Sequence, residues 1–361
     1  MNRPVGRAVV VLLALLATLA VAGPAPAHVG GGQAGSDFDG RVDRVSPQLP
    51  GVTVAVLQFG DQLEVVNRTA TEVEVPGYSA EPYLRIGPDG VWRNVHSPAT
   101  YLNLDRYAAT RLPPQADVAA AAEWQQVSTQ PSYVWHDHRT HWMSQDLLPP
   151  AVVADPTTSH TVIRWTVPMS YGGAPVSVTG ELTWSPPPPG RLVWPVYVLL
   201  LAATAAAGWL ARTPRPLAAV LGLGAAASLW HALATPEPAA SISSHSGALL
   251  GALLPALLVL LVAVIGVRCA QRRRGVLAGL MAVVAGWLLL VQGLPDVDVL
   301  WSAHLLATGP QLLARAAVVV LVAVGLGLVA GGAGAVRRFR EDAPAGIPPT
   351  APAPSPEPTR R

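Results

Sequence analysis

The sequence is unusual in the residues that it lacks. It contains 361 residues but only one cysteine, Cys269, and no lysine, so all 24 basic residues are arginine. A single cysteine cannot form an intrachain disulfide, and a folded domain must therefore be held together by its own core. The sequence also has no P-loop and no recognisable nucleophile–base pair or carboxylate dyad. We therefore expect neither a nucleotide partner nor an enzyme.

Residues 1–27 have the pattern of a secretory signal peptide. A basic start precedes an apolar run over residues 9–22, which is shorter than a membrane span. Small-residue cleavage sites end at Ala22 and at Ala27, and retention as an uncleaved anchor is the alternative. After cleavage at Ala27, His28 would become the N-terminus, where its amine and imidazole could chelate one metal ion.

Short alternating runs separated by turn residues dominate residues 28–184. Valines alternate over 52–56, a Pro-Asp-Gly turn divides a hairpin expected at 83–95, and longer alternating runs occupy 160–167 and 176–184. Strands at this spacing, without a convincing amphipathic helix, predict an all-β sandwich of the immunoglobulin-like kind. A domain of about 160 residues can bury a core without disulfides.

Five apolar segments follow a proline-rich linker at residues 185–191. Each approaches the roughly 20 residues that cross a bilayer, and we expect membrane spans at 192–211, 216–234, 247–267, 276–294 and 312–333. Arginines follow the first, third and fifth segments, whereas the other loops carry none before Arg315. Because positively charged loops face the cytoplasm, residues 28–184 are predicted to be extracytoplasmic and the C-terminus cytoplasmic, in a multi-pass plasma-membrane protein within the lipid bilayer.

The predicted five-helix membrane domain, residues 192–335, carries a few ionisable residues near the ends of its spans: His231, His245, Asp296, Asp298, His304 and Arg315. Such groups either reach water or have a function, and we expect Arg315 to pair with Asp296 or Asp298. Small residues are dense at 202–208 and 325–335, which favours close helix packing. Residues 336–361 are rich in proline and predict a disordered cytoplasmic tail.

The strongest candidate site is the segment Trp135–Met143, which contains three of the nine histidines. Imidazole is the commonest metal ligand at neutral pH, and the thioether of Met143 adds a preference for Cu(I). In an extended chain, His136 and His138 share one face and His141 and Met143 the other. The three histidines could therefore meet one metal ion only if the chain turns after His138.

Two other interpretations of this segment stay open. His-x-His-x-x-His resembles the zinc signature of metallo-β-lactamase-type hydrolases, but Thr140 takes the place of their aspartate, so zinc is less favoured. In a purely structural interpretation, Asp137 pairs with Arg139, the Trp rings pack in the sandwich, and the histidines bond to nearby backbone. His96 and His160 are single histidines beside strands, and we expect each to be satisfied or solvated.

The last two predicted strands resemble the closing strands of CopC-type periplasmic copper-binding proteins. The similarity covers residues 162–167, 172–176 and 180–184, and His28 matches the N-terminal histidine of that family. It implies a CopC-like sandwich that binds copper, fused to a membrane domain as in CopC–CopD proteins. The turn histidine of the family is replaced by Ala174. The segments SPATYLN and WHDHR-x-HWM also resemble a group of actinobacterial multi-pass membrane proteins, which implies an architecture but no activity.

Charge also favours a cationic ligand. Residues 28–190 contain sixteen Asp or Glu and nine Arg, a net charge of −7 before histidine titration. This balance disfavours nucleic acid and anionic surfaces, although solubility alone would explain it.

Our leading hypothesis is an external domain that binds copper or another transition metal for homeostasis or delivery. Its ligands would be His136, His138 and His141, with His28 and Met143 as helpers. The rival is a non-metal envelope protein whose Trp- and His-rich sandwich binds a protein or cell-wall partner.

Overall fold

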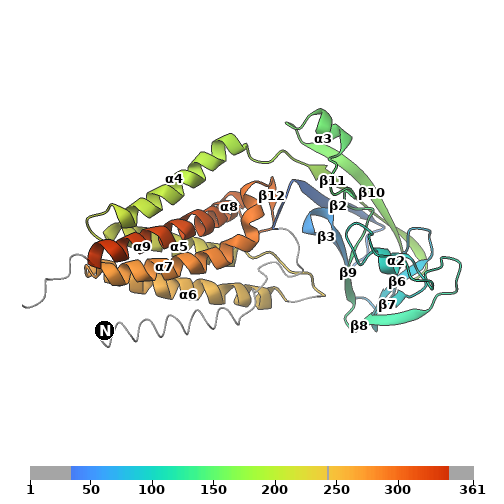
Figure 1. The fold of residues 1–361 in the computed structure, drawn as a ribbon. Coiled ribbons are helices and arrows are strands. Elements are labelled where there is room, and N and C mark those ends of the chain that lie inside the picture. The colour runs from blue at the N-terminus through green and yellow to red at the C-terminus, as the bar shows by residue number, and fades with distance from the viewer. Residues whose placement is uncertain (1–33, 242–243, 341–361) are drawn as a thin grey trace, which may run out of the picture.

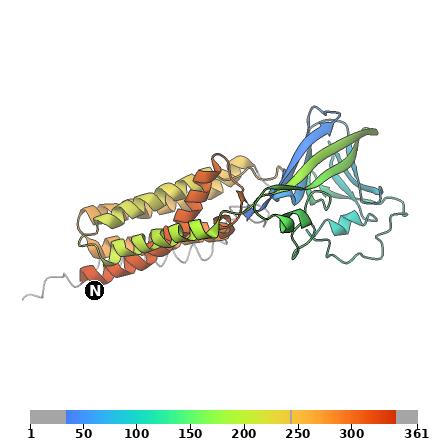
Figure 2. The same ribbon diagram turned by 90° about the horizontal axis from the view of Figure 1, so that it is seen from above.

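The computed structural model describes residues 34–241 and 244–340. They form a β-domain, residues 35–184, followed by five helices long and apolar enough to cross a membrane. The β-domain lies at one end of the helix bundle, which confirms the predicted order of the two parts (Figures 1 and 2). The predicted signal peptide, His28 and residues 341–361 of the predicted tail lie outside the described residues.

The larger sheet of the β-domain has seven antiparallel strands in the order β2-β11-β10-β5-β6-β7-β8. The strands are β2 (Phe38–Ser46), β5 (Val73–Pro76), β6 (Pro82–Gly87), β7 (Gly90–Asn94), β8 (Trp124–Ser128), β10 (His160–Tyr171) and β11 (Ala174–Trp184). The hairpin predicted at 83–95 is present as β6 and β7, which pair from Gly87 and Gly90 at the turn.

The smaller sheet has three antiparallel strands in the order β3-β4-β9. They are β3 (Val52–Leu57), β4 (Gln62–Asn67) and β9 (Ser132–His136), with a 3-10 turn η1 (Gln58–Gly60) between β3 and β4. Leu63 and Trp135 of this sheet share one buried core with Ile86 and Trp165 of the larger sheet. The β-domain is therefore a sandwich, with short helices α2 (Ala99–Leu102) and α3 (Pro150–Ala154) in its connections.

The hairpin of β10 and β11 shows why these residues form strands. Along β10, Trp165, Val167 and Met169 are buried and the residues between them are exposed, as the alternation predicts. The turn is made by Gly172 and Gly173, whose positive φ angles of 55° and 82° disfavour residues with a side chain. Each fully buried large apolar side chain contributes about 1.5–3 kcal/mol to folding.

Five transmembrane-length helical segments follow, at the positions predicted from the sequence. They are α4 (Gly190–Trp209), α5 (Arg215–Leu233), α6 (His245–Gln271), α7 (Gly275–Gly293) and a last segment made of α8 (Gln311–Val319), the π-helical turn η3 (Val320–Val324) and α9 (Gly325–Arg340). This is the fold of a multi-pass membrane protein. Helix α9 continues to Arg340, beyond the boundary predicted at residue 335.

Close packing in the bundle depends on glycine, as the small residues at 202–208 and 325–335 predict. A Cβ atom added to Gly208 of α4 would lie 1.7 Å from the carbonyl oxygen of Gly331 on α9. One added to Gly279 of α7 would lie 2.8 Å from the carbonyl oxygen of Gly332. The backbones of α4 and α7 therefore approach α9 more closely than any larger residue allows.

The two parts of the chain are joined by more than the linker. Strand β1 (Gly35–Ser36) pairs with β12 (His304–Leu305), which follows the 3-10 helix η2 (Leu294–Leu300) at the end of α7. The amide of Gly35 donates to Asp298 Oδ2 at 3.0 Å, and the amide of Ala303 donates to Asp37 Oδ1 at 2.8 Å. The start of the β-domain is thus bonded to the segment before the last span.

Arg315 does not pair with Asp296 or Asp298, which was the expectation from the sequence. Its guanidinium donates to the carbonyl oxygens of Val299 and Ala303, the latter at 2.9 Å, rather than to a carboxylate. Asp298 accepts from Gly35 instead, and Asp296 lies 3.2 Å from Nε2 of His231. The guanidinium of Arg315, which is partly removed from water, is therefore hydrogen-bonded to backbone carbonyl oxygens.

Candidate functional site

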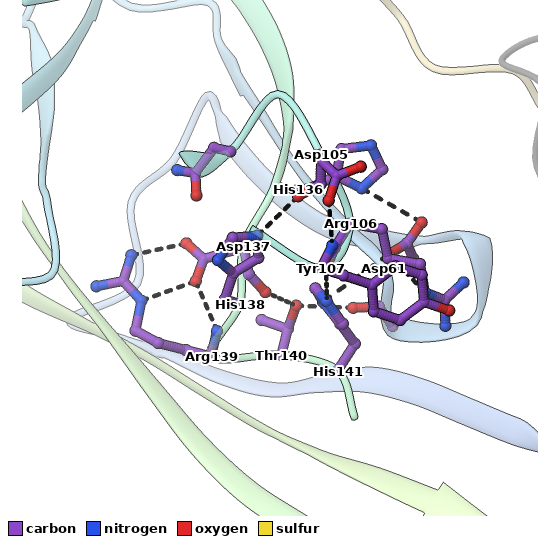
Figure 3. A network of polar contacts seen from close by, with 12 residues as sticks. Asp61, Asp105, Arg106, Tyr107, His136, Asp137, His138, Arg139, Thr140 and His141 are labelled. Atoms are coloured by element: carbon purple, nitrogen blue, oxygen red, sulfur yellow. Dashed lines mark hydrogen bonds and ion pairs between the residues drawn. The ribbon is translucent and has the colours of Figure 1, made fainter. Parts of the chain in front are cut away.

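The histidine segment does turn at the point that a shared site requires. Strand β9 ends at His136, and the amide of Thr140 donates to the carbonyl oxygen of Asp137 at 3.0 Å, which closes a turn. The hydroxyl of Thr140 also donates to Gly60 O, at 2.7 Å, and fixes the turn against η1. His136, Asp137, His138 and His141 therefore lie in one compact network (Figure 3).

Asp137 is the structural centre of that turn. Its fully buried carboxylate accepts from Nε and Nη2 of Arg139 at 2.8 and 2.7 Å, and from Trp135 Nε1 at 2.9 Å. Burial alone would raise the pKa of Asp137, but the bonds and charge of Arg139, with the Trp135 bond, lower it below the ordinary value. The pairing expected from the structural interpretation of this segment is present.

His138 is held by the loop that follows α2. Its Nε2 lies 2.9 Å from the carbonyl oxygen of Asp105, and its ring stacks on Tyr78 at a centroid distance of 5.7 Å. Since a carbonyl oxygen only accepts, Nε2 carries the hydrogen. The His138 ring meets the His141 ring edge-on at 5.6 Å, so it packs beside the remaining histidines.

The other two histidines approach Asp61, the residue before β4. The β4–β9 register pairs Gln62 with His136, which places the neighbouring Asp61 beside this histidine. Asp61 Oδ2 lies 3.3 Å from His136 Nδ1, and Asp61 Oδ1 lies 3.9 Å from His141 Nδ1. Both Nδ1 atoms and Oδ1 are buried without a hydrogen-bond partner among the described residues.

The protonation of His141 can be deduced from its partners. Its Nε2 lies 2.7 Å from the carbonyl oxygen of Arg106 and must donate, so in the neutral ring Nδ1 is an unprotonated lone pair. Burial lowers the pKa of His141 and keeps the ring neutral. A nitrogen lone pair therefore faces a carboxylate oxygen in a buried site, an arrangement that a cation between them would stabilise.

The pKa of His136 is shifted in the opposite direction from that of His141. The contact with the Asp61 carboxylate raises the pKa of His136, partly opposed by burial. The 3.3 Å separation is an ion-pair distance but lacks the alignment of a hydrogen bond. Arg106 adds a second cation, with its Nε 3.3 Å from Asp61 Oδ1. The cluster thus holds one carboxylate, one guanidinium and two imidazoles of different proton affinity.

Whether a metal ion fits this cluster depends on its donor atoms. Two imidazole nitrogens and a carboxylate oxygen suit Zn(II) or Cu(II), and ligands on one tetrahedral ion with bonds of about 2.0–2.1 Å lie about 3.3 Å apart. The separation of 3.3 Å between Asp61 and His136 matches that value, whereas the 3.9 Å between Asp61 and His141 is longer. However, no three His, Cys, Asp or Glu side chains in the described part of the chain are already placed to hold an ion. The guanidinium of Arg106 occupies the space beside Asp61.

The other candidate residues lie apart from the cluster. Met143 is exposed. His96 Nδ1 lies 2.7 Å from Ala121 O, and His160 Nε2 lies 2.6 Å from Asp155 O, so both have partners as expected. Ala174 is the exposed first residue of β11.

Sequence reasoning missed Asp61 and Arg106. Both are far from residues 135–143 in the chain, and only the pairing of β4 with β9 and the path of the loop after α2 bring them to the histidines. The signal that could have found Asp61 is its place directly before a strand, after a glycine.

The fold defines a class: a multi-pass membrane protein with a β-sandwich domain joined to one end of its five-helix bundle. Comparison of the chain with models of known families, with curated proteins and with solved structures gave no match.

Proposed function

We propose that this chain is an integral plasma-membrane protein whose β-domain lies outside the cytoplasm and binds a divalent transition metal, Cu(II) or Zn(II). The ligands would be Asp61 and the Nδ1 atoms of His136 and His141. The proposal rests on three buried atoms that could bind a metal ion and have no hydrogen-bond partner among the described residues. They are Asp61 Oδ1 and the Nδ1 atoms of His136 and His141, and both nitrogens face the Asp61 carboxylate. Buried polar atoms are normally paired, and a group of unpaired ones calls for an explanation.

The arrangement around the cluster supports metal binding. Histidine ligands of metal ions usually donate their other ring N–H to a carbonyl or carboxylate, which fixes the ring. His141 makes such a bond to Arg106 O through Nε2, with Nδ1 left for a metal ion. A bound ion would supply the positive charge that stabilises the lone pairs, and Arg106 would move away from Asp61. We regard His138 as a packing partner and Met143 as outside the site.

Orientation rests on the arginines. Those between α4 and α5, between α6 and α7, and at the end of α9 all lie at the end of the bundle away from the β-domain (Figure 1). Positively charged loops favour the cytoplasmic side. The β-domain is then extracytoplasmic, where a surface rich in carboxylates meets external cations.

The proposal is tested by titrating the full chain in detergent micelles with Cu(II), Zn(II) and Cu(I) by calorimetry. We expect one equivalent of Cu(II) or Zn(II) to bind more tightly than about micromolar, and Asp61→Asn or His141→Ala to weaken binding more than tenfold. His160→Ala is the matched control and should bind normally. Binding should also weaken as the pH falls through the raised pKa of His136, because that ring must lose its proton. A folded chain that binds none of these ions, or binds them unchanged with Asp61→Asn, would refute the site.

A second candidate function has one observation in its favour. Leu147, Leu148 and Val153 are 70%, 51% and 67% exposed on the segment that follows the histidines. Exposed apolar side chains that lie near one another are typical of surfaces that bind a partner. A non-metal envelope protein with a protein or cell-wall partner would require these three residues, whereas metal binding would be indifferent to replacing them with serine.

A further inference from the structure

A cavity of about 190 Å³ lies at the junction between the β-domain and the membrane domain. From the β-domain it is lined by residues of β2, β3 and η1. From the membrane half it is lined by the loop 236–239, the start of α6 and residues 304–306. Its volume corresponds to about six water molecules, which is enough for a small organic ligand. Asp61, Arg106, His136 and His141 are not among its described lining residues, although Gln62 is the neighbour of Asp61 in the chain.

The charge of this cavity has one sign. Asp39 and Glu237 line it, and no arginine is among its described lining residues. Glu64 adds a third carboxylate at the junction, where it accepts from the amide of Ala240 at 2.7 Å. The described lining residues of the cavity include the carboxylates of Asp39 and Glu237 and no guanidinium, although Arg41 lies near enough to interact with Asp39, and this balance favours cations.

Two buried atoms of the lining residues lack hydrogen-bond partners among the described residues. They are Oε1 of Gln58, which only accepts, and Nε2 of His304. Phe59 also lines the cavity, beside the apolar Leu57 and Leu305. An aromatic ring and apolar wall next to carboxylates and an unpaired acceptor are the features that recognise an ammonium group on a small apolar body.

The backbone at this wall is held in an uncommon conformation. Gln58, Phe59 and Gly60 have successive φ angles of 50°, 61° and 112°, although the first two are not glycine. Contacts from elsewhere in the fold keep the turn in place, since Gly60 O accepts from Thr140 and Gly60 packs on Gly40. Residues held in this way cluster at ligand sites, where the strain positions a side chain.

We propose that this junction cavity binds a small organic cation, an alkylammonium compound, between the β-domain and residues 236–239. The charged head would lie near Asp39, Glu237 and Gln58 Oε1, and the alkyl body against Phe59. Since no arginine lines the cavity to meet a phosphate, a free ammonium compound fits better than a lipid headgroup. This site does not depend on the metal site.

The test uses the full chain in nanodiscs of phosphatidylglycerol, a lipid without an ammonium headgroup, and choline as the probe. Calorimetry should detect choline binding below about 10 mM, and the neutral isostere 3,3-dimethylbutan-1-ol should bind at least about tenfold more weakly. The double variant Asp39→Asn/Glu237→Gln should weaken choline binding at least about tenfold. Glu123→Gln/Asp146→Asn makes the same charge change at exposed positions elsewhere and should leave binding unchanged.

Three further measurements test the role of Gln58, the source of the ammonium group and the independence of this site from the metal site. Gln58→Met keeps the size of the side chain but removes the unpaired acceptor, and should weaken choline binding in a folded protein. If nanodiscs of phosphatidylcholine compete with choline for the cavity, the natural ligand is a lipid headgroup. If they do not compete, the ligand is a free ammonium compound. His141→Ala should leave choline binding intact, which distinguishes failure here from failure of the metal site. Equal affinity for choline and its neutral isostere, or normal binding by the Asp39→Asn/Glu237→Gln variant, would overturn the proposal.

Discussion

Replacing Arg139 with methionine should destabilise the β-domain far more than replacing a surface arginine. Asp137 is fully buried and Arg139 only 20% exposed, and two bonds of 2.7 and 2.8 Å join them. Arg139→Met would leave the carboxylate buried with only the Trp135 ring N–H and a backbone amide as donors. Removing one partner of a buried ion pair costs about 3–5 kcal/mol.

The matched control is Arg41, whose side chain is 63% exposed and pairs with Asp43, itself 44% exposed, and with Glu181, which is 13% exposed. Arg41→Met should cost no more than about 1 kcal/mol, because ion pairs made by an arginine that lies mostly in water contribute little. Urea unfolding of the full chain in micelles, followed by tryptophan fluorescence, measures both. With a slope of about 2 kcal/mol per molar urea, the midpoint should fall by about 1.5–2.5 M for Arg139→Met and by less than about 0.5 M for Arg41→Met.

The double variant Asp137→Asn/Arg139→Met refines the test, because it leaves no charge buried and should recover part of the loss. Acid should act through the same pair: a carboxylate with a lowered pKa stabilises the fold above its ordinary pKa, and that contribution is lost as the pH falls through the folded value. Equal midpoints for Arg139→Met and Arg41→Met would refute the conclusion that this pair holds the histidine turn.

Other predictions concern the bundle and the junction. Gly208→Val should lower the thermal unfolding temperature of the chain, because the new side chain meets the carbonyl oxygen of Gly331, whereas Gly222→Ala, with open space around it, should not. Burial raises the pKa of Glu64 above its ordinary value of 4.5, so its contribution to stability is greatest below pH 4.5 and is lost as the pH rises through the folded value. Glu64→Gln should remove that part of the dependence, measured as the protection of the Ala240 amide from hydrogen exchange between pH 4 and 7. Gly180→Ala should prevent β11 from pairing with β2 normally, since its Cβ would lie 2.1 Å from Arg41 O, and circular dichroism of the strands would report it.

The features that follow from local pattern could be predicted from the sequence. The five membrane helices were predictable because each needs one apolar segment of bilayer length, and α4 through α9 lie where such segments occur. The strands of the β10–β11 hairpin follow from alternation around Gly172 and Gly173 in the same way. The bond between Asp137 and Arg139 is also local, two residues apart, and it was anticipated in the structural interpretation of this segment.

What the sequence could not provide is the meeting of distant segments. Asp61 reaches His136 only because β4 pairs with β9 in one register, and a shift of one residue would turn it to the other face. Arg315 shows the same limit: opposite charges near one another in sequence suggested an ion pair, but the backbone carbonyls of Val299 and Ala303 were available to its guanidinium. In both cases the partner of the side chain is set by segments that are distant in sequence or by backbone groups, which the local pattern does not reveal.

The pairing of β1 with β12 imposes an order on the assembly of the chain. Gly35 and Asp298 are bonded although they are 263 positions apart, so the beginning of the β-domain waits for nearly all of the membrane half to be synthesised. The remaining strands of the described residues pair only with one another, so their sheets can form earlier. The two-residue ladder at His304 and Leu305 can therefore close only after the four helices that precede it have been made. A ribosome halted before residue 304 would leave the β-domain without this ladder.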